Sequence, residues 1–249
     1  MAEQLNGLPL YFQPQKIKNA GEYVAQRITK IREKFSGNFP PPKFEDKSDD
    51  FLKSLAEDEL NFVILSFDIA NSTKLITTLN PEVYNRLISI VLYELSKVIP
   101  LFHGHVLKYT GDGLIAYFPA PSFITKNDLA IDCALTMIKL VFEGLNPVIK
   151  EIGYDAINIR IGLDSGAAFV TTIGSPDTKQ HKDIIGAVVS LATKIQSLAP
   201  NGTICLGETT YKNLHTDWRI ICEELRLPKD WRYKKAENSI YKVFIVKTG

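Results

Sequence analysis

The stretch Asn61-Phe-Val-Ile-Leu-Ser-Phe-Asp-Ile-Ala-Asn-Ser-Thr73 decides the fold. Residues 62–67 form a short apolar, β-prone run between polar residues, which is typical of a buried strand. The run ends at Asp68, and the Asn-Ser-Thr cluster that follows can cap a helix and offer backbone N–H groups to an anion. We therefore expect a buried strand that leads into a polar, anion-binding turn.

A second stretch, Val106-Leu-Lys-Tyr-Thr-Gly-Asp-Gly-Leu-Ile-Ala-Tyr117, complements the first. It consists of two β-prone runs around Tyr-Thr-Gly-Asp-Gly, which predicts a hairpin because glycine tolerates positive φ angles. Asp112 then lies at the tip of the hairpin. If the two strands are neighbours, Asp68 and Asp112 converge, and their carboxylates suit a hard divalent cation such as magnesium. For Asp68 alone, an exposed carboxylate at a strand end is the alternative.

The bulk composition is that of an ordinary globular protein. The 249 residues are 45% hydrophobic and carry a formal net charge of +1, which gives no electrostatic reason to expect nucleic acid or an anionic membrane as partner. No apolar run approaches the length of a transmembrane helix, and the first residues lack the pattern of a secretory signal. The three cysteines, Cys133, Cys205 and Cys222, are odd in number and far apart. We expect reduced thiols in a cytoplasmic protein without a membrane segment.

Apolar residues at helical spacing predict four longer helices, at 22–35, 81–98, 127–151 and 186–198. Short strands are expected at 202–206 and 239–246, a short helix at 208–214, and an antiparallel pair, 157–163 and 167–173, that turns at Asp164-Ser-Gly166. The order strand, helix, hairpin, helix, strand predicts an α+β fold with a ferredoxin-like βαββαβ core, in which helices cover one face of a mainly antiparallel sheet.

The chain before the first strand is expected to form an N-terminal extension. Its helix at 22–35 is followed by the proline-rich run 39–43 and a charged run at 45–50, which indicate a linker or the start of a helix. A surface helix is the default interpretation, and an arm that braces a dimer or regulates the protein is the alternative. We therefore divide the chain into an extension, 1–58, and a main domain, 59–249.

Four motifs in order resemble those of the class III nucleotidyl cyclases: residues 67–73, 108–113, 160–166 and 183–194. The resemblance extends from about residue 61 to about residue 246. It implies the ferredoxin-like cyclase fold for 59–249. It also implies a reaction in which the ribose 3′-hydroxyl of a nucleoside triphosphate attacks the α-phosphate and pyrophosphate leaves.

The resemblance also implies a metal and phosphate site. Two Mg²⁺ or Mn²⁺ ions per active site are expected on Asp68, the Ile69 carbonyl and Asp112. The β- and γ-phosphates would lie at the helix N-terminus formed by Ala70, Asn71, Ser72 and Thr73, and a further lysine, Lys235 or Lys234 in a loose alignment, would reach the triphosphate. A head-to-tail homodimer with shared active sites is implied as well.

Lys108 and Asp183 match the positions that recognise the base in this family. An ammonium donates to a ring acceptor and a carboxylate accepts from an exocyclic amine, which is the pattern of adenine. The resemblance thus predicts an adenylate cyclase that makes cyclic AMP from ATP in signal transduction. Cytosine presents the same pattern on a smaller ring, so a cyclase for cytidylate or another pyrimidine is the alternative. For Asp183, a helix N-cap near Gly186 is a further alternative.

The sequence departs from the family at two catalytic positions. Ser190 and Lys194 stand where the family has an asparagine and an arginine that stabilise the transition state, and at i, i+4 they still share a helix face. Serine has less reach, and lysine lacks the bidentate fork of arginine. Each change is expected to lower the rate on the order of 10²-fold, by analogy with the loss of one oxyanion donor. A weakly active pseudo-cyclase that binds nucleotide and regulates a partner is therefore a second alternative.

Overall fold

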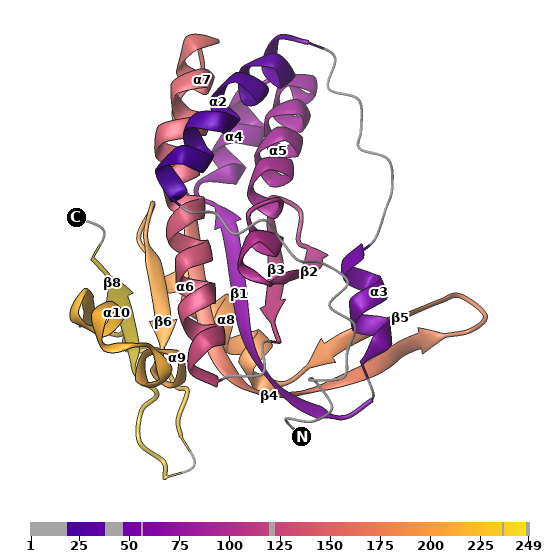
Figure 1. Cartoon of the computed structure of the whole chain (residues 1–249), viewed down its shortest axis with the longest axis vertical. Helices are drawn as coiled ribbons and strands as arrows, with labels where there is room; N and C mark the ends of the chain where they lie inside the picture. Colours follow the sequence, from indigo (N-terminus) through magenta and orange to yellow (C-terminus); the bar gives the residue numbers. More distant parts are fainter. Residues whose placement is uncertain (1–18, 38–46, 56, 120–122, 236, 248–249) are drawn as a thin grey trace.

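The computed structural model of the protein describes residues 19–37, 47–55, 57–119, 123–235 and 237–247. In these ranges one eight-stranded sheet has the order β2-β3-β1-β4-β6-β8-β7, with β5 paired to β4 (Figure 1). The strands are β1 (Glu59–Ile69), β2 (His105–Tyr109), β3 (Gly113–Phe118), β4 (Ile159–Ser175), β5 (Lys179–Ile185), β6 (Ile204–Gly207), β7 (Cys222–Glu224) and β8 (Val243–Val246). Among these described strands, only β4 and β6 pair in parallel. The α+β class with a mainly antiparallel sheet is confirmed.

Strand β1 lies in the middle of the sheet, between β3 and β4. Its residues 62–67 are all buried, on both faces of the sheet. The predicted neighbourhood of β1 and the 106–117 hairpin is confirmed, because Asp68 pairs with Gly113 at the end of the β1–β3 ladder. On its other side Asp68 lies opposite Arg160 of β4.

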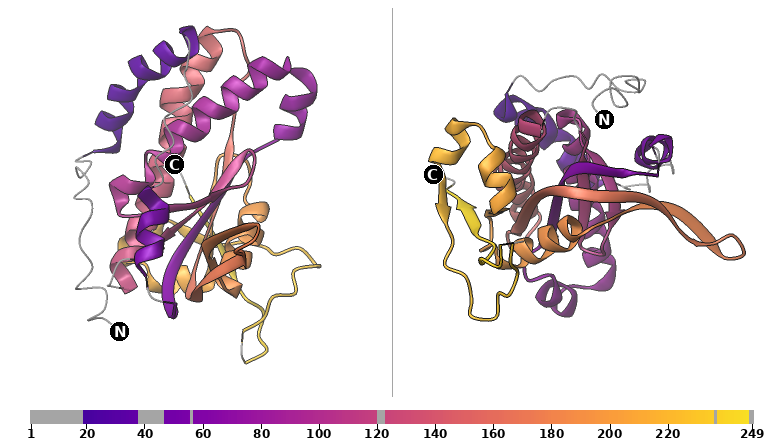
Figure 2. Two further views of the ribbon diagram at one scale, coloured as in Figure 1. Left: turned by 90° about the vertical axis from the view of Figure 1, so that its right-hand side faces the viewer. Right: turned by 90° about the horizontal axis from the view of Figure 1, so that it is seen from below.

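Helices cover both faces of the sheet. One face carries α2 (Ala20–Ser36), α5 (Pro81–Ser96) and α6 (Phe123–Lys139), which continues through the π-helical segment η2 (Leu140–Leu145) into α7 (Asn146–Glu151). The other face carries α3 (Lys47–Ser54) and α8 (Ala187–Leu198) (Figure 2). The expectation of helices on one face was wrong, since a strand whose residues 62–67 are buried on both faces must be covered on both sides. The shorter helices are α4 (Ser72–Thr78), η1 (Ile99–Phe102), α9 (Glu208–Asn213) and α10 (Thr216–Ile220).

The turn expected at Asp164-Ser-Gly166 does not exist. These residues continue β4, a single strand of 17 residues, and pair with Ile64, Val63 and Phe62 of β1. The chain reverses instead after Ser175, and β5 returns along β4. Polar side chains are tolerated here because they have internal partners: the Ser165 hydroxyl donates to Asn127 Oδ1 at 2.5 Å, and the Asp164 carboxylate accepts from Tyr241.

Helix α2 lies on the surface, as the default interpretation expected, and its apolar stripe packs on the main core. Val24, Ile31 and Phe35 are buried with residues of α5, α6 and η2. The Arg27 guanidinium forms two hydrogen bonds of 2.8 Å with the fully buried Glu94 of α5, and Lys34 also contacts this carboxylate. Removal of one partner from such a buried pair typically costs about 3–5 kcal/mol. The boundary at residue 58 stays a prediction, but α2 is fixed to the helices α5 and α6 of the main domain.

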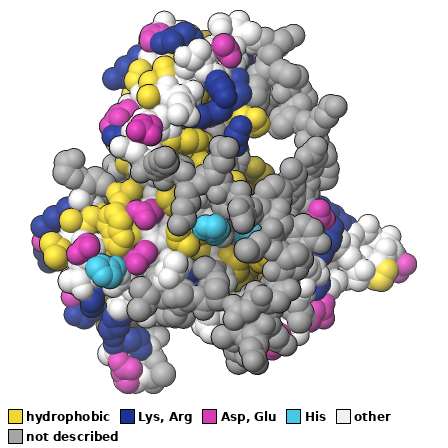
Figure 3. All heavy atoms as spheres, in the orientation of Figure 1, with side chains coloured by type: hydrophobic (Ala, Val, Ile, Leu, Met, Phe, Trp, Pro, Cys, Tyr) yellow, Lys and Arg dark blue, Asp and Glu magenta, His cyan; other side chains and the backbone are white. Residues whose placement is uncertain are grey.

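The surface has no dominant charge on the face drawn in Figure 3, where basic and acidic side chains are interspersed. Within the described ranges, no helix is long and apolar enough to cross a membrane. Cys133, Cys205 and Cys222 are free thiols, as expected.

Candidate active site

The two aspartates expected to bind metal come from adjacent segments of backbone. Asp68 lies near the end of β1, and Asp112 lies in the turn between β2 and β3. The Ile69 N–H donates to the Asp112 carbonyl at 3.3 Å, which ties the turn to the strand end. A Cβ atom at Gly113 would lie 2.1 Å from the Phe67 carbonyl oxygen, so this close approach requires glycine.

Arg160 is a residue of this site that the sequence reasoning missed. Its Nη2 lies 2.6 Å from Asp68 Oδ2 and its Nε lies 3.0 Å from Asp68 Oδ1, a bidentate pair between opposed residues of β4 and β1. Both side chains are partly exposed, at 29% for Arg160 and 26% for Asp68. The signal was present in the sequence, where the charged Arg160 stands between the apolar residues Ile159 and Ile161 of a predicted strand.

The oxygen atoms of Asp68, Asp112 and Ile69 suit a divalent cation whose remaining ligands come from a bound nucleotide or from water. In the described part of the chain, no three histidine, cysteine or acidic side chains lie close enough to hold a metal by themselves. Asp68, Asp112 and the Ile69 carbonyl would supply oxygen ligands, and phosphate oxygens or water would complete the shell. This is the manner in which Mg²⁺ is usually held beside a nucleoside triphosphate.

An open pocket of about 420 Å³ adjoins Asp112, one of the two predicted metal ligands. Its lining includes the predicted phosphate-binding residues Ser72 and Thr73 together with Asp112, and it is completed by Ile76, Tyr84, Asn85, Ile88 and Gly111. The three residues of α5 in this wall were not expected from the sequence. Burial, and next the charge of Asp112, raise the pKa of Tyr84, so its hydroxyl stays protonated and can donate a hydrogen bond.

The predicted phosphate-binding turn has the conformation of a helix start. Asn71 has φ 59° and ψ 27°, in the left-handed region, and α4 begins at Ser72. The Ala70 N–H already donates to the Asn158 carbonyl at 2.8 Å. Four backbone amides, those of residues 70–73, were predicted to bind phosphate. The Ala70 amide is not available for this, because it already forms a hydrogen bond within the fold.

The two predicted base-reading residues are in direct contact. Lys108 Nζ on β2 lies 2.5 Å from Asp183 Oδ2 on β5, although 75 positions separate them. The Lys108 side chain is 42% exposed and that of Asp183 is 10% exposed, so the pair is open to solvent on the lysine side. The other oxygen of Asp183 accepts from the Ile184 N–H at 2.8 Å. Asp183 does not cap α8, whose N-cap is Gly186 without a side-chain bond.

Ser190 and Lys194 lie together on the exposed side of α8. Within the described residues, neither side chain forms a hydrogen bond or ion pair with the aspartates of the same chain. One chain therefore does not bring the predicted transition-state residues to its own predicted metal ligands.

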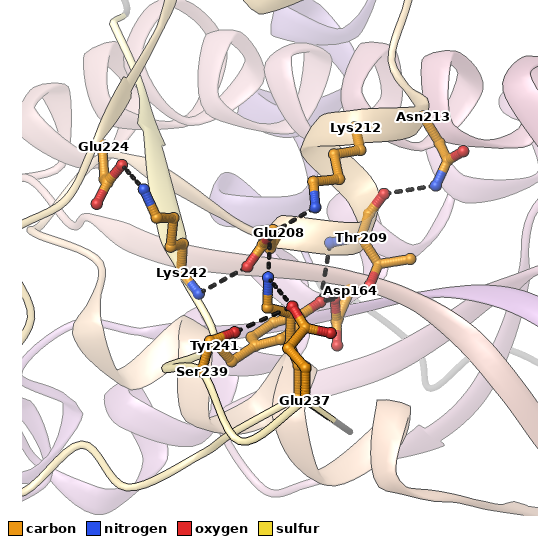
Figure 4. Close-up of polar contacts among 11 residues, drawn as sticks. Asp164, Glu208, Thr209, Lys212, Asn213, Glu224, Glu237, Ser239, Tyr241 and Lys242 are labelled. Atoms are coloured by element: carbon orange, nitrogen blue, oxygen red, sulfur yellow. Dashed lines mark hydrogen bonds and ion pairs between the residues drawn. The ribbon is translucent and has the colours of Figure 1, made fainter.

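Lys235 is held by acidic partners that sequence reasoning did not foresee. Its Nζ lies 3.0 Å from Glu208 Oε1 and 2.8 Å from Glu237 Oε1. Glu208 also contacts Lys212 at 2.6 Å and accepts from the Lys242 N–H at 3.2 Å, as Figure 4 shows. Burial alone would raise the pKa of Glu208, but its hydrogen bonds with Lys212 and Lys235 lower it to about 2. Glu208 is thus a permanent anion beside Lys235.

A buried carboxylate anchors the segment that carries Lys235. The Tyr241 hydroxyl donates to Asp164 Oδ1 at 2.6 Å and accepts from the Thr209 N–H at 2.9 Å (Figure 4). Asp164 is 1% exposed, and burial raises its pKa to about 7. A Cβ atom at Gly207 would lie 2.1 Å from Asp164 Oδ1, so only glycine leaves room for this carboxylate.

Comparison with known proteins agrees with this architecture. The family model of the adenylate and guanylate cyclase catalytic domain matches residues 56–229. A cytidylate cyclase of Escherichia coli is 28% identical over 165 residues, which are 63% of this chain and 36% of that protein. A uridylate cyclase of Rhodovulum sp. (strain MB263) is 26% identical over 147 residues, 56% of this chain and 59% of that protein. The chain thus spans only part of the length of these relatives.

Solved structures give the same fold. The crystal structure of the adenylyl cyclase CyaB from P. aeruginosa superposes with a TM-score of 0.67 at 23% identity and covers 78% of this chain and 97% of that chain. The sheet order, the motifs and the family match agree with one another. The chain therefore belongs to the adenylate and guanylate cyclase catalytic domain family, the class III nucleotidyl cyclases.

Proposed function

We propose that the protein is a nucleotidyl cyclase that converts ATP into 3′,5′-cyclic AMP and pyrophosphate. The observation that carries this proposal is the contact between Lys108 and Asp183, because it joins a hydrogen-bond donor and an acceptor from distant strands on a partly open surface. Adenine N1 and the N6 amine require this pair of groups side by side. On the same chain, Asp68 and Asp112 offer the oxygen ligands that the reaction needs.

Divalent cations, two Mg²⁺ or Mn²⁺ per site in our proposal, would activate the 3′-hydroxyl and neutralise charge on the phosphates when bound. Asp68, Asp112 and the Ile69 carbonyl would hold them. The free amides of the 71–73 turn and the pocket wall beside Asp112 would orient the β- and γ-phosphates. No residue in this arrangement has to act as a covalent nucleophile, so the rate depends on positioning and on charge stabilisation.

Ser190 and Lys194 would act on the transition state from a second copy of the chain. They are exposed on α8 and make no contact with the aspartates of their own chain, which favours a head-to-tail homodimer with shared sites. The Ser190 hydroxyl would donate a hydrogen bond, and the Lys194 ammonium would face the developing charge on the α-phosphate. Lys235, positioned by Glu208, would contact the triphosphate.

A cytidylate cyclase is the second candidate. Cytosine N3 and the N4 amine repeat the adenine pattern, and a cytidylate cyclase is among the relatives of this chain. The depth of the base pocket would decide between the two bases. Guanine and uracil place a donor where Lys108 needs an acceptor, so GTP and UTP are expected to be poor substrates.

A nucleotide-binding pseudo-cyclase is the third candidate, and Ser190 and Lys194 are the residues that favour it. The test is to incubate the purified protein with ATP and Mn²⁺ and to measure cyclic AMP and pyrophosphate together. Asp112→Ala is the matched control, because its side chain lines the pocket without entering the core. Product from the wild type and none from Asp112→Ala supports the proposal. Binding of ATP without either product contradicts it in favour of a pseudo-cyclase.

A further inference from the structure

Helix α3 precedes the region matched by the cyclase family model, which begins at residue 56. It nevertheless belongs to the folded domain. Leu52 and Leu55 are 3% and 4% exposed, and they pack in the same cluster as Phe62 and Ile64 of β1 and Val188 of α8. Figure 1 shows α3 beside β2 and β5, next to the strands that carry Lys108 and Asp183.

The contact of α3 with β2 is an aromatic stack. The Phe51 ring lies 4.0 Å from the ring of His105, with an angle of 10° between the planes, and His105 in turn stacks on Tyr117 of β3 at 5.2 Å. Burial, and next the charge of His103, lower the pKa of His105 to about 4, so its ring is neutral at pH 7. A neutral stacked ring forms a stable apolar contact between the helix and the strand.

The contact of the same segment with β5 and β4 is polar. Lys182 Nζ on β5 donates to the Leu55 carbonyl at 2.7 Å, and the Thr172 hydroxyl on β4 donates to Glu57 Oε1 at 2.6 Å. The Asp58 carbonyl accepts from the Val170 N–H at 3.0 Å. The end of α3 is thereby fixed to the β4–β5 hairpin.

Strands β2 and β5 are not neighbours in the sheet, and apart from α3 they meet through the Lys108–Asp183 ion pair. Strands β3, β1 and β4 separate them in the sheet order. A bulge between Val106 and Lys108 puts Lys108 opposite Ile115, which lies in the cluster covered by α3. His105 is three residues before Lys108, and Lys182 is adjacent to Asp183. The two residues that hold the α3 segment, His105 on β2 and Lys182 on β5, are therefore each close in sequence to one member of the base-reading pair.

We propose that α3 is a specificity-determining clamp, in which Phe51 and Lys182 are positioning residues that hold Lys108 and Asp183 at the spacing that a purine or pyrimidine edge requires. The inference rests on the proposed base-reading function of this pair. The inference goes beyond that function by making selectivity among nucleobases depend on a helix that precedes the region matched by the family model. Loosening α3 should make the spacing between donor and acceptor variable, and should weaken recognition of the preferred base more than it slows the chemical step.

The test compares Phe51→Ala with Phe51→Tyr, which keeps the stack, and with Val24→Ala. Val24 is 2% exposed on α2 and packs on the other face of the sheet, so its truncation removes core contacts without touching the cluster that contains Phe51. For each variant, kcat and KM are measured for ATP, CTP, GTP and UTP with Mn²⁺. Amide hydrogen exchange is followed in peptides covering 105–109 and 179–185. Lys108→Ala serves as the reference for loss of base reading.

We expect Phe51→Ala to lower the ratio of kcat/KM between the best and the worst nucleotide by about tenfold or more, mainly through KM for the best one. Exchange in both peptides should accelerate by about tenfold. Phe51→Tyr should match the wild type, and Val24→Ala should lower Tm without changing the ratio. A ratio in Phe51→Ala equal to that of Val24→Ala would overturn the clamp while leaving the cyclase function intact. If Lys108→Ala retains full selectivity, the base-reading assignment fails, and the exchange data alone then decide whether α3 couples β2 to β5.

Discussion

The Arg160 guanidinium binds both carboxylate oxygens of Asp68, at 2.6 and 3.0 Å. The two residues lie directly opposite each other on β4 and β1. A cation that binds Asp68 must therefore share this carboxylate with Arg160 or displace it. Since both side chains are partly exposed, the ion pair itself is worth only about 0.5–1 kcal/mol of stability.

The first prediction concerns this competition. In Arg160→Met the Asp68 carboxylate loses its partner, so Mn²⁺ without nucleotide should bind about tenfold more tightly than to the wild type. The measurement is the Mn²⁺ concentration that gives half of the maximal rise in Tm. In Asp68→Asn that rise should disappear. If Arg160→Met binds Mn²⁺ with unchanged affinity and Asp68→Asn shows the same rise in Tm as the wild type, then Asp68 is not a metal ligand.

The second prediction concerns the shared site. Asp112→Ala and Lys194→Ala should each be inactive as homodimers, because each lacks one side of both active sites. After subunit exchange, a mixed dimer holds one site with all its residues, so activity should return to about a quarter of the wild-type value at equal mixing, given random pairing. Exchange is verified with differently tagged chains. Inactive mixtures in which exchange has been demonstrated would contradict the shared arrangement.

A third prediction concerns the two departures from the family. Replacing Ser190 by Asn and Lys194 by Arg restores the longer donor and the bidentate fork. Since both positions are exposed on α8, stability should hardly change. We expect kcat to rise by about tenfold or more with little change in KM, because in our proposal these groups act on the transition state. Thr193, also exposed on α8, provides the control Thr193→Ala. A fall in kcat in the double variant would show that this site uses serine and lysine in another way.

The fourth prediction is a dependence of stability on pH. The pKa of Asp164 is about 7 in the folded protein and 3.8 for an ordinary aspartate. Between these values the folded state binds more protons than the unfolded state, so this residue lowers stability as pH rises, by up to about 4 kcal/mol above pH 7. Asp164→Asn removes this term and should be more stable than the wild type at pH 8, with a flatter profile from pH 5 to 8.

The measurement for this prediction is the urea midpoint at each pH. Asp155 is exposed, and Asp155→Asn should follow the wild-type profile. If Asp164→Asn and the wild type give parallel profiles, then the Asp164 carboxylate is not protonated in the folded protein at neutral pH.

Local sequence patterns predicted the strands that are buried throughout and the helices that bury a single apolar stripe. The run at 62–67 predicted β1 because every residue is buried. Helical spacing predicted α5 and α8, whose apolar stripes face the sheet. The false turn at 164–166 has a different cause. Asp-Ser-Gly has the composition of a turn, and the partners that allow it inside a strand, such as Tyr241, lie far along the chain.

The candidate site was predictable only in part for the same reason. The hairpin pattern at 106–117 predicted that Asp68 and Asp112 lie close together. The contact of Lys108 with Asp183 crosses 75 positions and joins two strands that are not neighbours in the sheet, so the spacing in the sequence does not predict it. Nothing in the sequence around Glu208 or Phe51 indicated that either residue lies beside the site. A single carboxylate or aromatic residue among polar and apolar neighbours is common in any protein. Their importance comes from the residues that the fold brings to them.

Product analysis with all four nucleotides tests the central claim most directly. The purified protein is incubated with Mn²⁺ and with ATP, CTP, GTP and UTP, each alone and then in an equimolar mixture, and the cyclic products are identified. The donor and acceptor at Lys108 and Asp183 predict cyclic AMP as the main product, cyclic CMP as the second, and little from GTP or UTP. Faster turnover of GTP or UTP than of ATP, or no cyclic product from any nucleotide, would contradict the account.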